Sequence, residues 1–483
     1  MPAPHIPALR LGRPYASADR APVPDYRSGE ALAWISQVNS ALIRRDLFRP
    51  DGEAAGGRAL PAADLLETAR RAGELFARET LPLGEETQSP DTFITQVSAS
   101  TGLPCPLVRR HVRRIAELCA HLPEVLRGLI REDDLSLLDG GWVKHNGAVR
   151  AFAPLTPALG VVMPSNSPGV NTLWLPAIAM KVAVALKPGR DDPWTPYRLF
   201  QALLAAGLPA DALSYYPTDH EGAMAILRSA GRSLLFGDDE TTAPWRGDSR
   251  VEIHGPGRSK VLVGEDLLDA AGTLEVCISS ILENSGRSCT NASTIVVPRR
   301  GAEIAEALAA RLATVEPRPP EDEEAKLAAF VRPEIAERID AAIEQGLRGG
   351  GAVDVTGAVR GGGRLVRAHG GTYLLPTIIR CDSLAHPLAN REFLFPFASV
   401  VEIPEMEMAE AIGPSLVVTA LTRNETVIRR LLAAPHIGRL HIGPIPTWQV
   451  AWDQPHEGNL FELLYRRRAL QVGEISAPVP GRS

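Results

Sequence analysis

Short apolar strands alternate with helical patterns along residues 159–254. This alternation predicts βαβ units and hence a parallel, doubly wound sheet. No G-x-G-x-x-G follows a predicted strand, so the usual dinucleotide fingerprint is absent. Strands are indicated at residues 160–163, 182–186, 214–216, 233–236 and 251–254, and helices at 172–180, 196–206 and 221–229. Because such sheets bind ligands beyond the carboxyl ends of their strands, we expect a site among residues 164–166, 187–190 and 237–239.

A second α/β pattern follows over residues 296–442. Its helices are indicated at residues 302–312, 333–345 and 426–434, and its strands at 374–379, 398–403, 416–421 and 440–443. Near the N-terminus we expect a strand at 31–38 and helices at 61–77 and 107–122. Four arginines of the last helix are interpreted as a solvated face rather than an anion site: Arg109, Arg110, Arg113 and Arg114.

Asn146-Gly147 lies between two strand-like runs at residues 142–152, which is a strong hairpin signal. An isolated two-stranded ribbon is marginally stable in water. We therefore expect the hairpin to pack against the body of the protein or against another subunit.

Length and composition restrict the class of protein. A chain of 483 residues predicts two or three domains, and 45% hydrophobic with 22% charged residues is typical of a soluble globular protein. The net charge of −6 argues against nucleic-acid or anionic-membrane partners. The N-terminus lacks the apolar stretch of a signal peptide, and residues 159–186 are too interrupted for a membrane span. We expect a cytoplasmic protein.

The cysteines indicate free thiols in a reducing compartment. There are five of them, scattered along the chain, and none has the spacing of a metal ligand, so we expect no metal site. Cys289 follows a glycine turn between a helical pattern at 267–282 and a β-branched strand at 293–298. A thiol at such a junction is suited to be a nucleophile, because the backbone holds it while the sulfur faces a cleft. The alternative is a small buried filler.

Six separated motifs occur in one order: PSNSP at 164–168, AVALKPG at 183–189, AGLP at 206–209, HGPGRSK at 254–260, NSGRSC at 284–289 and EFLFP at 392–396. From about residue 27 to residue 470, this set resembles the aldehyde dehydrogenase superfamily. The resemblance implies an α/β fold with a Rossmann-like cofactor domain at residues 1–134 and 156–265 and a catalytic domain at 266–443. It also implies an oligomerisation hairpin with a C-terminal segment, at 135–155 and 444–483, and therefore a homodimer or homotetramer.

The resemblance also implies roles for single residues. Cys289 matches the nucleophile that attacks an aldehyde and forms a thioester. Asn166 matches the amide of the oxyanion hole, although it also has the position of a helix N-cap before Pro168. Cofactor-binding positions for NAD or NADP are Met163, Pro164, Ser165, Lys187, Arg190, Phe236, Gly237, Gly255, Glu392 and Leu394, among which Lys187 matches an adenosine-ribose contact and Glu392 a nicotinamide-ribose contact.

His254 departs from the family pattern, because it occupies the place of the glutamate that activates water. Members that lack this glutamate tend to transfer the acyl group to coenzyme A or to reduce acyl thioesters. We therefore favour acylating chemistry on a small aldehyde or acyl thioester, with coenzyme A as co-substrate, over hydrolysis to an acid. Glu252 lies on the same face of the predicted strand as His254 and is the alternative base.

Arg190 is a second departure, because family members that prefer NAD often carry a glutamate there. An arginine favours the 2′-phosphate of NADP, although Asp191 and Asp192 follow it. Asp238 and Asp239 would repel a pyrophosphate unless they cap a helix or point away. The substrate lining is expected near Leu173, Trp174, Thr290, Asn291 and residues 448–452.

Two further hypotheses come from other classes of protein. A catalytically idle member of the family would serve as an oligomeric scaffold, and the unusual residues Asp238 and His254 favour this interpretation. A thiol redox sensor would need a resolving cysteine for Cys289, and Cys277 is the candidate on the preceding helix.

Overall fold

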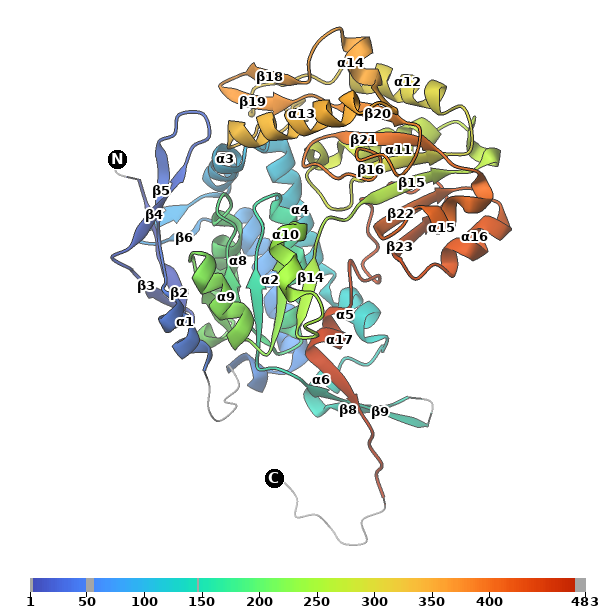
Figure 1. The fold of residues 1–483 in the computed structure, drawn as a ribbon. Helices are drawn as coiled ribbons and strands as arrows, with labels where there is room; N and C mark the ends of the chain where they lie inside the picture. The colour runs from blue at the N-terminus through green and yellow to red at the C-terminus, as the bar shows by residue number, and fades with distance from the viewer. Residues whose placement is uncertain (1–2, 49–55, 146, 474–483) are drawn as a thin grey trace, which may run out of the picture.

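The computed structural model describes residues 3–48, 56–145 and 147–473, which form two sheet-centred halves (Figure 1). The first half contains a seven-stranded sheet whose first five strands are parallel, as the βαβ rhythm predicts. Its spatial order is β14 (Val251–His254), β13 (Arg232–Phe236), β10 (Ala158–Val162), β11 (Ala183–Lys187), β12 (Leu213–Tyr215), β2 (Ala8–Arg10) and β3 (Arg13–Tyr15).

The second half contains another seven-stranded sheet, parallel except for its edge strand β17. Its spatial order is β17 (Ala352–Asp354), β20 (Thr377–Cys381), β21 (Phe397–Glu402), β16 (Ala292–Val297), β15 (Ser259–Val263), β22 (Ser415–Leu421) and β23 (Ile437–Ile442). Strands β16 and β22 are buried on both faces, which explains their near-continuous β-branched and aliphatic sequences.

Amphipathic helices cover both sheets. In α2 the buried residues Leu65, Ala69, Ala72 and Phe76 recur at helical spacing, and this face joins the largest apolar core. Helices of the first half include α2 (Ala62–Arg78), α3 (Pro90–Thr101), α4 (Cys105–Ala120), α5 (Leu122–Ile130), α8 (Trp194–Ala205) and α9 (His220–Ser229). Those of the second half include α11 (Thr273–Leu282), α12 (Gly301–Leu312), α13 (Pro333–Arg348), α14 (Val355–Arg360) and α16 (Glu425–Leu432).

Several predicted elements are wrong in extent, mostly at proline or glycine. The helix predicted at 172–180 is a 3₁₀ segment, η2 (Pro168–Leu173), followed by the short α7 (Pro176–Ala179). The strand predicted at 374–379 is two strands, β19 (Gly371–Leu374) and β20, with Pro376 between them. In both places a proline removes the N–H that a continuous element would use. Helix α11 starts only at Thr273, after left-handed Gly272.

The hairpin expected from Asn146-Gly147 is formed by β8 (Trp142–His145) and β9 (Ala148–Pro154), and Asn146 itself lies outside the described residues. A strand that the sequence did not predict, β24 (Tyr465–Arg468), pairs with β9 and makes a three-stranded sheet. Figure 1 shows this sheet projecting from the first half. Its role in oligomerisation stays a prediction.

The C-terminal segment returns from the second half to the first. After β23 the chain crosses to α17 (Leu460–Leu464), which packs beside α5 and α7 (Figure 1). The intervening residues 443–459 therefore pass the junction between the two sheets. Within the described residues, no helix combines the length and apolarity needed to span a bilayer.

Candidate active site

A cavity of about 980 Å³ lies between the two halves, at the carboxyl ends of the first sheet's strands. Its position agrees with the rule for ligand sites in parallel sheets. Predicted site residues that line it are Pro164, Ser165, Asn166, Phe236, Gly237, His254, Gly255, Cys289, Glu392 and Leu394. The C-terminal segment adds residues 448–452 and 454–458 to the wall.

The turn that carries Cys289 has a strained backbone. Asn284, Ser285 and Gly286 have φ values of 50°, 56° and 67°, in the left-handed region that non-glycine residues rarely adopt. Specific bonds hold the first two, because Asn284 Oδ1 lies 2.7 Å from His111 Nε2 and Ser285 Oγ accepts the Ala328 N–H at 2.8 Å. Strain of this kind persists where the surroundings fix it, often at functional sites.

The backbone of Cys289 is held by the loop before β15. The Ser259 hydroxyl donates to the Cys289 carbonyl at 2.9 Å. Gly257 packs so closely against the same carbonyl that a Cβ there would lie 2.0 Å from its oxygen. Asn291 fixes the other side of the turn, because its Oδ1 accepts the Ser288 N–H at 2.8 Å. These contacts leave the sulfur of Cys289 on the cavity wall.

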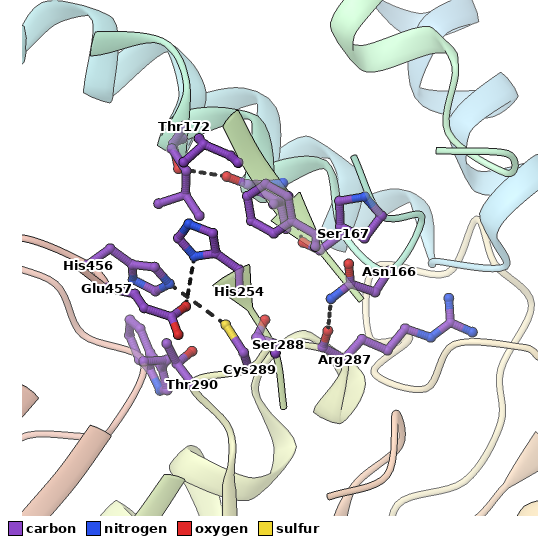
Figure 2. A pocket seen from close by; sticks show the side chains of 18 of the residues that line it. Asn166, Ser167, Thr172, His254, Arg287, Ser288, Cys289, Thr290, His456 and Glu457 are labelled. Carbon is purple, nitrogen blue, oxygen red and sulfur yellow. Dashed lines mark hydrogen bonds and ion pairs between the residues drawn. The ribbon is translucent and has the colours of Figure 1, made fainter. Parts of the chain in front are cut away.

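Asn166 lies beside the turn that carries Cys289, where Figure 2 shows its amide directed at Arg287. Its Nδ2 donates to the Arg287 carbonyl at 2.8 Å, and its buried Oδ1 has no partner among the described residues. The helix-cap alternative is wrong, because Ser167 caps η2 by accepting the Gly169 N–H. The role of Asn166 as an oxyanion donor stays a prediction.

His254 is buried between two carboxylates. Its Nδ1 lies 2.8 Å from Glu457 Oε2, its Nε2 lies 3.2 Å from Glu252 Oε1, and its ring stacks on Phe236. Burial alone lowers the pKa of His254, but the hydrogen bonds and charges of Glu252 and Glu457 outweigh it and raise the pKa to about 9. The imidazole is therefore protonated at neutral pH. Both Glu252 and His254 line the cavity.

Two residues near the sulfur were missed by the sequence analysis. His456 Nε2 lies 3.7 Å from Cys289 Sγ, and Glu457 follows it in the chain (Figure 2). Burial, with the charges of Glu457 and Glu392, raises the pKa of the Cys289 thiol above its usual value, so the thiol is protonated at rest. No periodic pattern surrounds His456, and only the Pro-His-Glu-Gly turn sequence marks the segment.

Residues predicted to bind a nucleotide fall into two groups. Met163, Lys187 and Arg190 do not line the cavity, although the Met163 N–H donates to the Lys187 carbonyl at 2.9 Å. Lys187 Nζ donates to the Pro188 carbonyl at 3.0 Å, and burial lowers the pKa of this amine. Arg190 is exposed. These residues lie where β10 and β11 end side by side.

The acidic residues next to Arg190 and at the end of β13 are bound to partners within the protein. Asp191 forms a bidentate pair with Arg332 at 3.1 and 3.2 Å. Asp192 is buried and accepts the Thr195 N–H at the start of α8. Near the end of β13, Asp238 caps α10 (Asp239–Thr242), and Asp239 pairs with Arg246 and Arg258. All four carboxylates are therefore occupied by contacts within the protein.

Glu392 reaches the cavity from the loop before β21. Its Oε2 accepts the Arg258 N–H at 2.8 Å, and burial raises the pKa of the carboxyl to about 7. The same loop that packs on Cys289 thus also binds Glu392. Leu394, a further predicted cofactor contact, is 43% exposed on the cavity side.

The residues expected to line the substrate site lie in part on the wall of the cavity. Leu173, Thr290 and residues 448–452 line the cavity, whereas Trp174 is fully buried against Phe200. The Asn291 side chain also points away from the cavity, and it donates to the carbonyls of Ser280 and Glu283. The solvated face predicted for α4 is wrong at one position, because Arg114 lines the cavity, approaches Glu283 and lies over the ring of Trp448.

The model of the aldehyde dehydrogenase family matches residues 87–459. The chain belongs to the aldehyde dehydrogenase family. The 5-carboxymethyl-2-hydroxymuconate semialdehyde dehydrogenase of Escherichia coli is 22% identical over 408 residues, covering 80% of each chain. A betaine aldehyde dehydrogenase of Cereibacter sphaeroides is 25% identical over 470 residues, covering 87% of this chain and 86% of the relative.

Solved structures have the same fold. The aldehyde dehydrogenase KauB from Pseudomonas aeruginosa is 18% identical, with a TM-score of 0.77 and 96% of each chain covered. An NAD⁺ complex of aldehyde dehydrogenase from Bacillus cereus is 15% identical, with a TM-score of 0.77 and 97% of each chain covered. The predicted fold class and the predicted enzyme class, an NAD(P)-dependent aldehyde oxidoreductase, are confirmed.

The position of Cys277 bears on the redox-sensor alternative. A redox pair with Cys289 finds no support in the position of Cys277, which is fully buried in the core of the second half and does not line the cavity. Burial raises the pKa of the Cys277 thiol to about 12. Among the described residues, no cluster of three or more His, Cys, Asp or Glu side chains is placed to bind a metal.

Gly257→Ala should lower kcat/KM for aldehyde oxidation roughly 100-fold, because the added Cβ must displace the Cys289 carbonyl from its present position. The matched control is Gly362→Ala, where a Cβ meets nothing within 4 Å. Steady-state kinetics and melting temperatures of both variants check this. Unchanged kinetics in Gly257→Ala would show that the close contact does not position Cys289 for the reaction.

His254→Gln should reduce stability in a pH-dependent manner. The folded-state pKa of about 9 lies above the unfolded value of about 6.5, so the stabilisation by protonated His254 is complete below pH ~6.5 and is lost as pH rises through 9. The free-energy gap between wild type and variant, measured by denaturant unfolding, should therefore shrink from pH 6 to pH 9.5. Exposed His220→Gln serves as control, and a gap constant with pH would contradict the ion-pair account.

Proposed function

We propose that this aldehyde dehydrogenase oxidises a small aldehyde through a thioester on Cys289 and transfers the acyl group to water. The observation that carries the proposal is the sulfur of Cys289 on the wall of a cavity that also holds the Asn166 amide and an imidazole–carboxylate cluster. A thiol nucleophile, an oxyanion donor and a base are the groups that this chemistry requires.

A carboxylate near the nucleophile supports water as the acyl acceptor. The sequence favours coenzyme A as the acyl acceptor because His254 occupies the position of the glutamate found in hydrolytic members of the family. Glu457 lies 2.8 Å from His254 and supplies a carboxylate at this place from another part of the chain. The named relatives also act on free aldehydes by name, namely a muconate semialdehyde and betaine aldehyde. Transfer to coenzyme A stays a prediction for direct test.

Asn166 is suited to stabilise the oxyanion. An amide carries two N–H donors, and the contact with the Arg287 carbonyl uses one of them. Because Arg287 is itself buried and fixed, the remaining donor is oriented before substrate arrives. Preorganised donors of this kind contribute about 3–4 kcal/mol to transition-state stabilisation when they act on developing charge.

The cavity fits a dinucleotide beside the nucleophile. It is about 980 Å³ in volume, and the buried Oδ1 of Asn166, which has no partner within the described part of the chain, offers an acceptor for a polar ligand. Ser165, Gly237 and Glu392 would hold the bound cofactor from three strand-end loops. A bound nicotinamide supplies the hydride acceptor. The NAD⁺ complex of the Bacillus cereus aldehyde dehydrogenase, which has the same fold, supports this assignment.

The residues after β11 favour NADP. Arg190 is exposed with its guanidinium available to solvent, whereas the acidic side chains of Asp191 and Asp192 are bound within the protein. The two acids therefore do not compete for a ribose hydroxyl. An arginine at this edge suits a 2′-phosphate, because guanidinium groups bind phosphate in a bidentate manner.

A panel of aldehydes with NAD⁺ or NADP⁺, each with and without coenzyme A, tests the proposal. We expect nicotinamide reduction with at least one aldehyde, free acid as product and no dependence on coenzyme A. Product formation that requires coenzyme A would contradict transfer to water. Cys289→Ala should lose roughly 10³-fold or more in rate while still binding nucleotide, measured by calorimetry. If wild type showed neither turnover nor nucleotide binding, that result would favour the scaffold alternative.

A further inference from the structure

His456 comes within hydrogen-bonding distance of the nucleophile from a segment that none of the six motifs includes. Its Nε2 lies 3.7 Å from Cys289 Sγ, a normal distance for a hydrogen bond to sulfur, and Figure 2 shows the ring directed at the sulfur. Both side chains line the same cavity. The contact joins residues 167 positions apart, so it depends on the return of the C-terminal segment.

Contacts on both sides of His456 fix its position. The Arg439 guanidinium donates to the Pro455 carbonyl at 2.5 Å, and Glu457 lies 2.8 Å from His254. Further along, Asn459 Nδ2 donates to the Leu129 carbonyl at 2.9 Å. Gly128 packs against the Asp453 carbonyl so closely that a Cβ there would lie 2.1 Å from the oxygen. The imidazole is therefore held at the sulfur by contacts to both halves of the molecule.

The charges around the pair keep both partners neutral at rest. Burial lowers the pKa of His456 to about 3, assisted by Arg439 from β23 and protonated His254 from β14. Burial and the carboxylates of Glu457 and Glu392 raise the pKa of the Cys289 thiol. Glu252 also faces His254 from β14. A neutral imidazole has a free lone pair, and a neutral thiol needs a proton acceptor before its sulfur can bond to carbon.

We propose that His456 is a catalytic residue, the general base that accepts the thiol proton as Cys289 attacks the aldehyde. In this step the S–H bond breaks and its proton moves to Nε2, while Sγ forms a bond to the carbonyl carbon. The carbonyl π pair moves to oxygen, where the Asn166 amide stabilises it. Neither neutral partner ionises alone, so proton transfer and attack occur together. The inference rests on the proposed function.

The test is alkylation of Cys289 by iodoacetamide in the full-length protein, followed by mass spectrometry across pH 6 to 10. Alkylation also replaces S–H by S–C, and it needs neither aldehyde nor cofactor. We expect His456→Gln to slow labelling of Cys289 at least tenfold near neutral pH, with the difference from wild type narrowing as the pH rises toward 10. His220→Gln, an exposed position, should behave as wild type, and Cys289→Ser gives the background from the other thiols.

A second variant separates the base from a structural role. In His456→Ala, added imidazole should restore labelling, whereas sodium chloride at the same ionic strength should not. If His456→Gln labelled within twofold of wild type at every pH, the proposal would be overturned. The proposal would also be overturned if added imidazole failed to rescue labelling in a His456→Ala variant whose melting temperature is unchanged. Slow labelling of the variants in a protein that oxidises no aldehyde would support the proton transfer and reject only the proposed function.

Discussion

Arg287 joins the two halves of the protein next to Cys289. Its buried guanidinium donates to the carbonyls of Thr101, at the end of α3, and Ala329, before α13. Its own carbonyl accepts the Asn166 amide from the first sheet. Burial lowers the pKa of Arg287 to about 10, so it remains charged at neutral pH. Because an unpaired buried charge costs several kcal/mol, these contacts hold the turn of Cys289 and the amide of Asn166 in one fixed arrangement.

The electrostatics of the cavity oppose ionisation of the thiol before substrate binds. The carboxylates of Glu392 and Glu457 act on Cys289, whereas protonated His254 is occupied by Glu252 and Glu457. A neutral thiol reacts slowly with oxidants and other electrophiles, since the thiolate is the reactive form. The arrangement thus keeps the sulfur protonated at rest, and the proposed general base would accept its proton when substrate binds.

The fold was largely predictable from local patterns. Strand β14 was predicted with its observed bounds, and β10, β13 and β16 lie within two residues of the predicted ranges, because each is a short apolar run between turn residues. Strands β2, β15 (Ser259–Val263) and β24 were among those missed. Strands β2 and β24 have only three or four residues and gain their hydrogen bonds from a distant partner, so their own sequences carry little signal. Strand β15 is a buried five-residue strand that begins inside the HGPGRSK motif, whose sequence is typical of a loop.

The site residues likewise fall into those that the local sequence predicted and those that it did not. The sequence placed Cys289 and Asn166 in loops beside predicted strands and His254 at the end of one, at the edge where parallel strands bind ligands. Glu392 was assigned only through the resemblance of the motifs to the family. Only the tertiary structure placed His456 at the sulfur and Glu457 at His254, which changed the argument about the acyl acceptor. The physical reason is that a local pattern encodes burial and backbone bonding within a segment. The protonation state of a side chain depends instead on burial and on charges that distant segments bring to it.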